Sequence, residues 1–385
     1  MKIRHYLRYP IDIARAKNRL SDRSAGTSVF GNRPIVLDLY TPDLLIDCGR
    51  HFASIAHYAA QHQSALIIRC QRLLLAAIAH KPFGTQALEM QNVSWVGDDQ
   101  LVPANAVVMT DVANRDVTRR LNGQPITTML IGKDFMIGDD IAPAGSVMPY
   151  PMHPAILKFA DRSCLLASRA TSNRSGLFFA GSQRAKYGRD VMRKGFDVLN
   201  RLEILDCVRQ TYEQRIVTQR SEVQSADRMP IILPPTEAGD AAVPISTDQW
   251  LPTLAQHQFF LCCPGIAQPM CHNIIEAMSV GVIPVVEYPE RFCPMLIDGQ
   301  NAITYRGRQG LHAAIERIDA MDRDVIAAIS ERVSTYYDEH LDGERFIGRL
   351  LSETNERRPS AICLPFHDEN LTAMKSIKLA AAAVA

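Results

Sequence analysis

The stretch that most constrains this chain is 258–288, which reads QFFLCCPGIAQPMCHNIIEAMSVGVIPVVEY. The short apolar run 259–263 has the length of a buried strand, and a Pro-Gly pair then breaks it. From Cys271 onward, apolar residues recur at helical spacing until Gly281, which is suited to end a helix. The run 282–286 predicts a second buried strand. In an α/β domain, strand, loop, helix and strand in this order predict two parallel strands joined by a right-handed crossover.

The loop of this unit indicates where a ligand would bind. In open parallel sheets, ligands bind beyond the carboxyl ends of the strands. The loop 264–270 and the polar start of the helix at 271–273 follow the first strand. We therefore expect a binding site at this edge.

The same order of elements carries a family resemblance. Strand, Pro-Gly, a helix with Glu-Ala and then Gly-x-x-Pro-Val resembles the nucleotide-sugar half of GT-B glycosyltransferases, most closely the exostosin-like branch and its bacterial relatives. The resemblance implies that Glu276 binds the ribose of the donor and that Gly281 and Pro284 shape the wall behind it. Many retaining GT-B enzymes have a second Glu eight positions earlier, where this chain has Gln268. Inversion is therefore expected.

A second informative stretch is 176–189. The run 177–180 predicts a buried strand, and Arg184, Lys186 and Arg189 follow it. Exostosin-like domains open with a similar Phe-Phe-Ala-Gly. The turn and the next helix start favour an anion, so these cations would neutralise the diphosphate of a departing nucleotide; the alternative is a solvated basic loop. The predicted donor-binding residues are Glu276, Arg184, Lys186, Arg189, Gly265, Gln268, His272, Asn273, Gly281 and Pro284.

Three residues in the first half are candidate bases for activating an acceptor hydroxyl. Asp47 and His51 lie between a predicted strand and a predicted helix, and Asp111 ends another predicted strand. The alternative is a helix cap at Asp47, a surface His51 and a cap at Asp111. In this half the sequence predicts strands at 35–39, 44–46, 65–69, 93–96, 106–110 and 127–131, and helices at 53–60 and 73–79.

Composition excludes several other classes of protein. The 385 residues have 47% hydrophobic content and a net charge of +1, which gives no reason to expect nucleic-acid binding. Nine cysteines in a chain this long predict buried reduced thiols, with no metal site. No signal peptide or membrane span is predicted, so a cytoplasmic location is expected. The basic segment 1–33 is either a solvated end or a contact with the inner face of a membrane.

The predicted fold class is α/β, with two Rossmann-like domains facing a cleft, the GT-B arrangement. An acceptor-side domain covers 1–150 and a nucleotide-sugar domain covers 151–355. The resemblance implies that the tail 356–385 packs back on the first domain as a helix. In the second domain, the sequence predicts a long surface loop at 217–247.

The implied activity is transfer of a sugar from a nucleotide diphosphate donor to a hydroxyl of a glycan or glycolipid acceptor. It would serve polysaccharide or glycoconjugate synthesis, with inversion and without a metal or a cofactor besides the donor substrate. Two alternatives stay open: a nucleotide-sugar epimerase of the same fold, and a non-catalytic sugar- or protein-binding relative.

Overall fold

In a computed structural model, the chain forms two compact units. We describe each unit by itself. The first unit contains Met1–Pro154 and Gly343–Ala385, and the second contains Ala155–Asp342. The structure describes residues 3–21, 31–45, 47–112, 126–130, 145–218, 228–234, 245–266, 268–353 and 361–364. Most of the tail 356–385, for which a helix was expected, lies outside the described residues. Its described part contains a strand at 361–363, so the helix prediction is wrong there.

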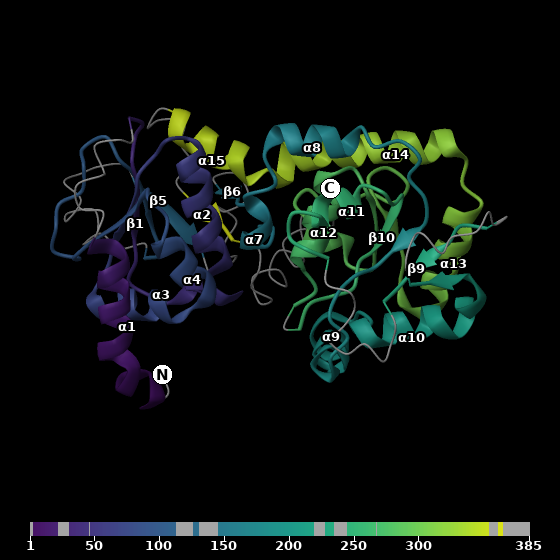
Figure 1. Cartoon of the computed structure of the whole chain (residues 1–385), viewed down its shortest axis with the longest axis horizontal. Coiled ribbons are helices and arrows are strands. Elements are labelled where there is room, and N and C mark those ends of the chain that lie inside the picture. Colours follow the sequence, from purple (N-terminus) through teal and green to yellow (C-terminus); the bar gives the residue numbers. More distant parts are fainter. Residues whose placement is uncertain are drawn as a thin grey trace, which may run out of the picture. The chain divides into compact units, whose positions relative to one another are not determined.

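The first unit is built on a parallel sheet of seven strands in the order β3-β2-β1-β4-β5-β13-β6. Figure 1 labels β1, β5 and β6 of this sheet. The strands are β1 (Ile35–Asp38), β2 (Leu66–Arg69), β3 (Val93–Val96), β4 (Val107–Thr110), β5 (Ile126–Leu130), β6 (Gly145–Val147) and β13 (Ala361–Cys363). Every residue of β1 and β4 is buried, as expected for strands covered on both faces. The strand β13 comes from the far end of the chain and inserts between β5 and β6.

Helices follow the strands of this unit in the sequence. They are α1 (Ile3–Ser21), the 3-10 turns η2 (Asp43–Leu45) and η3 (Asp47–Gly49), α2 (Arg50–Gln61), α3 (Arg72–His80), α4 (Pro82–Leu88), α7 (Pro154–Leu157), which crosses the unit boundary, and α15 (Gly343–Ser352). The predicted helices at 53–60 and 73–79 are confirmed. So are the predicted strands at 35–39, 65–69, 93–96, 106–110 and 127–131, within a residue or two at their ends.

One prediction for the first unit is wrong and another is wrong in part. The predicted strand at 44–46 is the turn η2, whose Leu44 and Leu45 are buried, so three apolar residues did not distinguish a strand from a buried turn. The predicted solvated end contains the helix α1, which buries Asp12 and Ala16, while its other positions from 8 to 20 are exposed or half-buried. The other possibility for this segment, a contact with anionic lipid, stays a prediction.

The second unit has a parallel sheet of six strands in the order β12-β11-β10-β7-β9-β8. The strands are β7 (Leu177–Phe178), β8 (Ile216–Val217), β9 (Ile231–Ile232), β10 (Phe259–Leu261), β11 (Ile283–Val286) and β12 (Ile303–Thr304). The predicted loop at 217–247 is interrupted by β9, so that prediction is wrong in part. A strand of two residues is too short to show an alternating pattern.

The predicted strand, loop, helix and strand at 258–288 is confirmed. The helix is α12 (His272–Ser279), and β10 pairs in parallel with β11, with Phe259 opposite Ile283. Gly281 ends the helix with φ +76°, its N–H donates to the Met278 carbonyl, and Val282 N–H donates to the Ala277 carbonyl. This double hydrogen bond is the Schellman ending, which needs a residue that tolerates positive φ.

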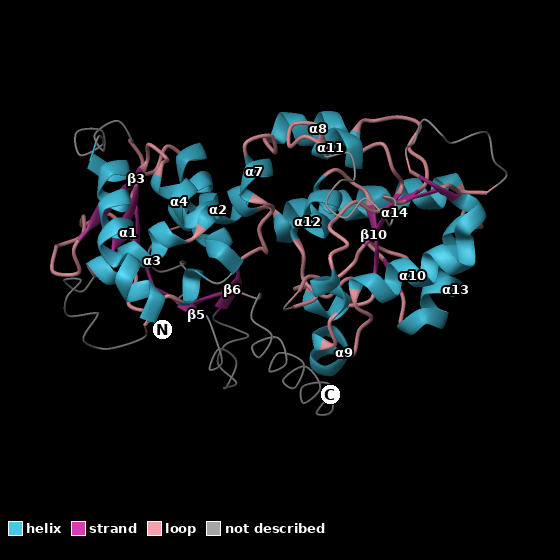
Figure 2. Ribbon diagram, turned by 60° about the horizontal axis from the view of Figure 1, so that its bottom comes forward, coloured by secondary structure: helices cyan, strands magenta, loops and turns pink. Residues whose placement is uncertain are grey.

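The other helices of the second unit lie between and after its strands, and Figure 2 shows the strands enclosed among helices. Both sheets are parallel and alternate with helices, so the α/β class with two Rossmann-like domains is confirmed. The helices are α8 (Arg162–Arg169), η4 (Ala185–Gly188), α9 (Val191–Phe196), α10 (Arg201–Tyr212), η5 (Glu213–Arg215), α11 (Trp250–Leu254), η8 (Pro289–Arg291), α13 (Gly307–Asp319), α14 (Arg323–Tyr336) and the π-helical turn η9 (Tyr337–Leu341).

A buried ion pair joins the strand ends of the first sheet. Asp38 ends β1 and Arg69 ends β2, the two residues are opposite each other, and they are 0% and 2% exposed. The Arg69 guanidinium donates to the Asp38 carboxylate and to the carbonyls of Asp98 and Gln100, the last at 2.9 Å. The pair therefore fixes the ends of two strands and the turn that follows β3.

Replacing Asp38 by Ala would leave the Arg69 charge buried without its carboxylate. We expect the free energy of unfolding to fall by about 3–5 kcal/mol, the usual cost of breaking a buried pair from one side. Urea unfolding followed by circular dichroism measures the change. The matched control is Asp99→Ala, since Asp99 is exposed in the same turn and should change stability little. A loss below 1 kcal/mol in Asp38→Ala would show that the pair does not stabilise the sheet.

Candidate functional site

At the carboxyl edge of the second sheet, one buried arginine holds two loops together. Arg201, the first residue of α10, is 4% exposed. Its Nη1 donates to the Ser182 carbonyl in the loop after β7, and its Nη2 donates to the Pro264 carbonyl in the loop after β10, each at 2.9 Å. Its guanidinium carbon also lies 3.8 Å from the centre of the Tyr187 ring, a cation–π contact.

Two further side chains extend this cross-linking. Arg209 Nη2 donates to the Gln183 side-chain oxygen at 2.6 Å and to the Pro234 carbonyl after β9 at 3.0 Å. Asn273 Nδ2, near the start of α12, donates to the Ala180 carbonyl at 3.1 Å. The loops that follow β7, β9 and β10 are thus fixed to one another before any ligand binds.

Sequence reasoning missed Arg201 and Arg209. The motif Asn200-x-x-Glu203 forms a capping box and signals that a helix starts at Arg201. That signal predicts the helix but not the direction of the arginine side chain, which turns back under two loops distant in sequence.

Glu276 lies within the second unit with both carboxylate oxygens engaged. It is 0% exposed, and Trp250 Nε1 donates to its Oε2 at 2.6 Å. Its Oε1 is 2.9 Å from Nδ1 of His272, one turn earlier on α12, and the His272 side chain is 26% exposed. When Nδ1 carries the proton, it donates to Glu276 and leaves Nε2 as an acceptor. The structure therefore presents His272 at the surface with Glu276 behind it.

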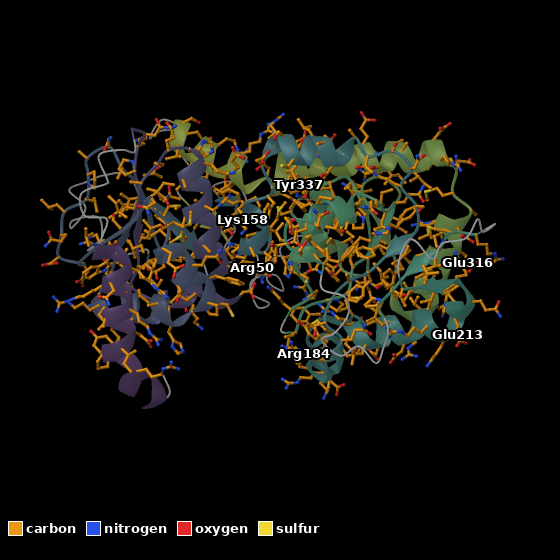
Figure 3. All side chains as sticks on the ribbon, in the orientation of Figure 1. Arg50, Lys158, Arg184, Glu213, Glu316 and Tyr337 are labelled. Carbon is orange, nitrogen blue, oxygen red and sulfur yellow. The ribbon has the colours of Figure 1, made fainter. Side chains whose placement is uncertain are left out.

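The three predicted cations follow β7 at the same edge. Arg184 and Arg189 flank the turn η4 and are exposed, and Figure 3 labels Arg184. Lys186 lies within η4, with its Nζ 5.5 Å from the centre of the Tyr187 ring. Three positive charges thus follow one strand end, an arrangement that favours a polyanion such as a diphosphate.

The loop after β10 is closely packed around Gly265. A Cβ at this position would lie 2.8 Å from the Gln268 carbonyl oxygen and 3.2 Å from that of Met270, so only glycine fits. The Gln268 side-chain oxygen is buried and has no hydrogen-bond partner in the described part of the chain. A buried acceptor without a donor is costly, so a water molecule or a ligand group is expected to donate to it.

Gly281 and Pro284 lie elsewhere. Gly281 follows the carboxyl end of α12 and precedes β11, so it is at the amino edge of the sheet, away from the start of α12. Pro284 lies inside β11, opposite Phe260. The structure thus brings Glu276, His272, Asn273, Gly265, Gln268, Arg184, Lys186 and Arg189 to the carboxyl-edge loops and helix starts, but not these two residues.

The first unit places Asp47 in an unusual backbone segment before α2. Asp47, Cys48 and Gly49 have φ of 52°, 60° and 82°, three successive left-handed residues of which two have side chains. Such strain is frequent at functional sites. Asp47 Oδ2 accepts hydrogen bonds from Arg50 Nε at 2.7 Å and from the Tyr150 hydroxyl at 2.9 Å. Burial raises the pKa of Asp47, but Arg50 and Tyr150 outweigh it, so the pKa lies below its ordinary value.

The other two candidate bases are more enclosed. His51 is 0% exposed, which contradicts the alternative of a surface histidine, and burial lowers its pKa to about 3. Asp111 accepts hydrogen bonds from Tyr40 N, Thr41 N and Thr41 Oγ1 at 2.9, 2.7 and 2.8 Å. Burial raises the pKa of Asp111 despite these donors. Asp111 thus holds the segment after β1 in place.

The described residues contain no group of three or more His, Cys, Asp or Glu side chains that could hold a metal ion. The tripeptide 322–324 has the spacing Asp-x-Asp and begins α14, at the amino edge of the sheet. All nine cysteines are free, and near the central motif Cys262 and Cys263 are buried while Cys271 and Cys293 are half-buried. Within the described ranges, no helix is both long and apolar enough to cross a bilayer.

No protein-family model and no curated protein matches this sequence. Similar solved structures include a glycosyltransferase from Rickettsia africae, with TM-score 0.45 and 9% identity over 84% of this chain and 100% of that one. HepE from Anabaena, solved with UDP and glucose, has TM-score 0.40 and 11% identity over 84% and 100%. WaaG, a glycosyltransferase of lipopolysaccharide biosynthesis, has TM-score 0.36 and 11% identity over 83% and 100%. At such identities, similarity does not extend to the reaction.

The buried His51 predicts a pH dependence of stability. Its pKa falls from an ordinary 6.5 to about 3 on folding. Between these two pH values, His51 is protonated in the unfolded chain and neutral in the folded chain. The stability that His51 contributes is therefore complete above about pH 6.5 and is lost as the pH falls from there toward about 3. In His51→Leu, the unfolding free energy should fall less steeply between about pH 6 and pH 4, by up to about 1.4 kcal/mol per pH unit. Equal slopes for the two proteins would contradict a neutral, buried His51.

Proposed function

We propose that this protein is a glycosyltransferase of the exostosin-like GT-B type, which binds a nucleotide-sugar donor at the carboxyl edge of the second sheet. The observation that carries the proposal is the shared location of two predicted groups. The Glu276–His272 pair begins α12, and the cations Arg184, Lys186 and Arg189 surround η4. Asn273 joins the start of α12 to the Ala180 carbonyl after β7, and Arg201 joins the loop after β7 to the loop after β10. A nucleoside diphosphate has the hydroxyls and the charge that such a pair of groups would recognise.

In this proposal Glu276 acts on the ribose through His272. The carboxylate accepts the Nδ1 proton, fixes the orientation of the ring and strengthens Nε2 as an acceptor for a ribose hydroxyl. Trp250 holds the other carboxylate oxygen at 2.6 Å and prevents the pair from reorienting. The role that the sequence motif implies for Glu276 is thereby divided between a buried carboxylate and a half-exposed imidazole.

The reaction is a single displacement at the anomeric carbon. The acceptor hydroxyl gives its proton to a base as its oxygen bonds to the anomeric carbon, and the bond to the diphosphate breaks. The leaving nucleotide keeps that electron pair, and the η4 cations stabilise the added charge. One displacement inverts the configuration, in keeping with Gln268 where many retaining enzymes have Glu.

Asp47 is the base that we assign to this reaction. We choose Asp47 from the three candidates for two reasons. Its side chain is 30% exposed, and its Oδ1 has no hydrogen-bond partner among the described residues. Arg50 and Tyr150 both donate to Oδ2, so they fix the carboxylate and leave Oδ1 to accept a proton. The acceptor would be a glycan or glycolipid hydroxyl, and the product would enter polysaccharide or glycoconjugate synthesis.

A panel of nucleotide sugars with oligosaccharide acceptors tests the donor site. The wild-type protein should release free nucleotide only when an acceptor is present, and His272→Ala and Glu276→Gln should each weaken donor affinity about tenfold or more, since a charge-assisted hydrogen bond is lost. Glu213→Gln is the matched control, because Glu213 is exposed on η5 (Figure 3). An isomerised donor would establish the epimerase alternative instead, and binding without turnover would establish the non-catalytic one.

The base assignment has its own test. Asp47→Asn keeps the shape of the side chain but cannot take a proton, so kcat should fall about 10²–10⁴-fold with little change in KM for the donor. Asp111→Asn, at another candidate base, is the control variant, and a circular dichroism spectrum checks the fold of both variants. Unchanged kcat in Asp47→Asn would remove Asp47 from the reaction.

A further inference from the structure

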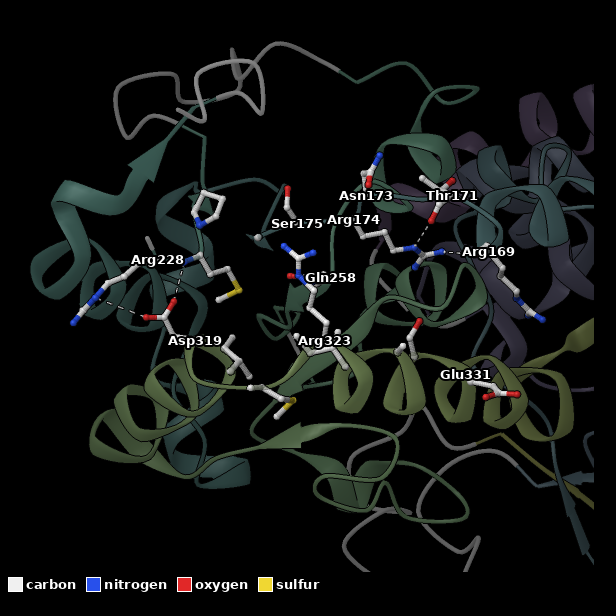
Figure 4. Close-up of a pocket in the computed structure, with 18 of the residues that line it drawn as sticks. Arg169, Thr171, Asn173, Arg174, Ser175, Arg228, Gln258, Asp319, Arg323 and Glu331 are labelled. Carbon is white, nitrogen blue, oxygen red and sulfur yellow. Dashed lines mark hydrogen bonds and ion pairs between the residues drawn. The ribbon is translucent and has the colours of Figure 1, made fainter. Parts of the chain in front are cut away.

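A cavity of about 1040 Å³ lies at the other edge of the second sheet, where the strands begin (Figure 4). Ser175, Pro230 and Gln258 line it, and they lie just before β7, β9 and β10. The end of α13 and the first turns of α14 complete its wall. Its volume is of the size that holds a small ligand. Parallel strands have one carboxyl edge and one amino edge, so this cavity is separate from the proposed donor site.

The lining of this cavity is suited to hydroxyl groups. Its polar side chains include Thr171, Asn173, Ser175, Gln258, Ser330 and Ser334. None of the described lining residues is Phe, Tyr, Trp or His. A nucleotide base would find no ring to stack on, whereas a sugar would find both donors and acceptors of hydrogen bonds.

Arg174 lies in the wall of this cavity and is held in place by backbone carbonyls. Its Nη2 donates to the carbonyls of Ser168, Arg169 and Val280 at 3.0, 3.0 and 2.9 Å, which fixes the guanidinium plane. Its Nη1 is buried and has no hydrogen-bond partner in the ranges that the structure describes. In those ranges, no carboxylate forms an ion pair with Arg174. Burial lowers the pKa of Arg174 most, and the charge of Arg169 lowers it further.

The remaining charges leave the cavity net positive. Figure 4 shows Arg323 pointing into the cavity from the start of α14, and it forms no ion pair among the described residues. The acid Asp319 is engaged by Arg215 at 2.8 Å, and Arg169 is engaged by Asp338 at 2.7 Å. The lining contains four arginines against Asp319 and Glu331, so an anionic group is favoured.

We infer that this cavity binds an anionic carbohydrate, a sugar that carries a phosphate or a carboxylate. Its charged group pairs with the guanidinium group of Arg323, and its hydroxyls bond to the serine, threonine and amide side chains. The site is independent of the transfer reaction proposed above and holds if the protein has no transferase activity.

Isothermal titration calorimetry with the full chain tests this site, with glucose 6-phosphate, glucuronate, glucose and inorganic phosphate as probes. We expect glucose 6-phosphate or glucuronate to bind saturably, at least tenfold more tightly than either glucose or phosphate. Arg323→Ala should weaken this binding at least fivefold. Ala327→Trp, at an exposed lining position one turn later on α14, should block it by filling the cavity. Arg162→Ala, an exposed arginine of α8 outside the lining, is the matched control and should bind as the wild type does.

Both variants change exposed positions, so folding is expected to persist and is checked by circular dichroism. Saturable binding that is lost in both variants and kept in the control supports the site. Binding that survives both variants lies elsewhere and overturns the inference. No saturable binding of a charged sugar, or phosphate binding as tight as that of glucose 6-phosphate, overturns it as well.

Discussion

The second unit depends on a buried positive charge that needs no carboxylate. Arg201 is 4% exposed, and taking a guanidinium out of water is costly unless its donors are satisfied. Two loop carbonyls and the face of Tyr187 meet this requirement. Because the carbonyls belong to different loops, satisfying the arginine also fixes the loops to each other. Rigid loops lower the entropy lost on binding, which is what a donor site at a sheet edge requires.

The same principle appears at the opposite edge with a different result. Arg174 is also held by carbonyls, but its buried Nη1 has no hydrogen-bond partner among the described residues. Arg201 therefore joins two loops with its donors satisfied, while Arg174 keeps one unsatisfied donor. The local sequence does not show this difference, because the carbonyls that bind each arginine include some that are distant in the chain.

The parts of the fold that could be predicted are those where local physics is strong. The apolar runs of β10 and β11 and the glycine at 281 specify their unit because burial, crossover handedness and positive φ all agree. By contrast, β8 and β9 have two residues each, so their pairing rather than their pattern defines them. The turn η2 has apolar residues because they are buried, as the residues of a buried strand are. Its conformation therefore depends on the elements packed around it and not on the local pattern.

For the candidate site, sequence reasoning found residue types but not their partners. The helix motif identifies Glu276, yet Trp250, which binds one of its oxygens, is 26 positions earlier and belongs to another helix. His51 has no local feature that separates a buried helix face from an exposed one, and the fold places it at 0% exposure. Contacts between elements far apart in sequence depend on the complete packing, which local spacing does not contain.

The position of β13 determines when the first sheet can be completed during synthesis of the chain. This strand lies between β5 and β6, although more than two hundred residues separate it from either neighbour in the sequence. The ribosome therefore releases the entire second unit before the seventh strand of the first sheet is available. Until then, β5 and β6 both present unpaired backbone edges, which are prone to intermolecular association. The first sheet therefore stays incomplete at this position until the end of the chain has been synthesised.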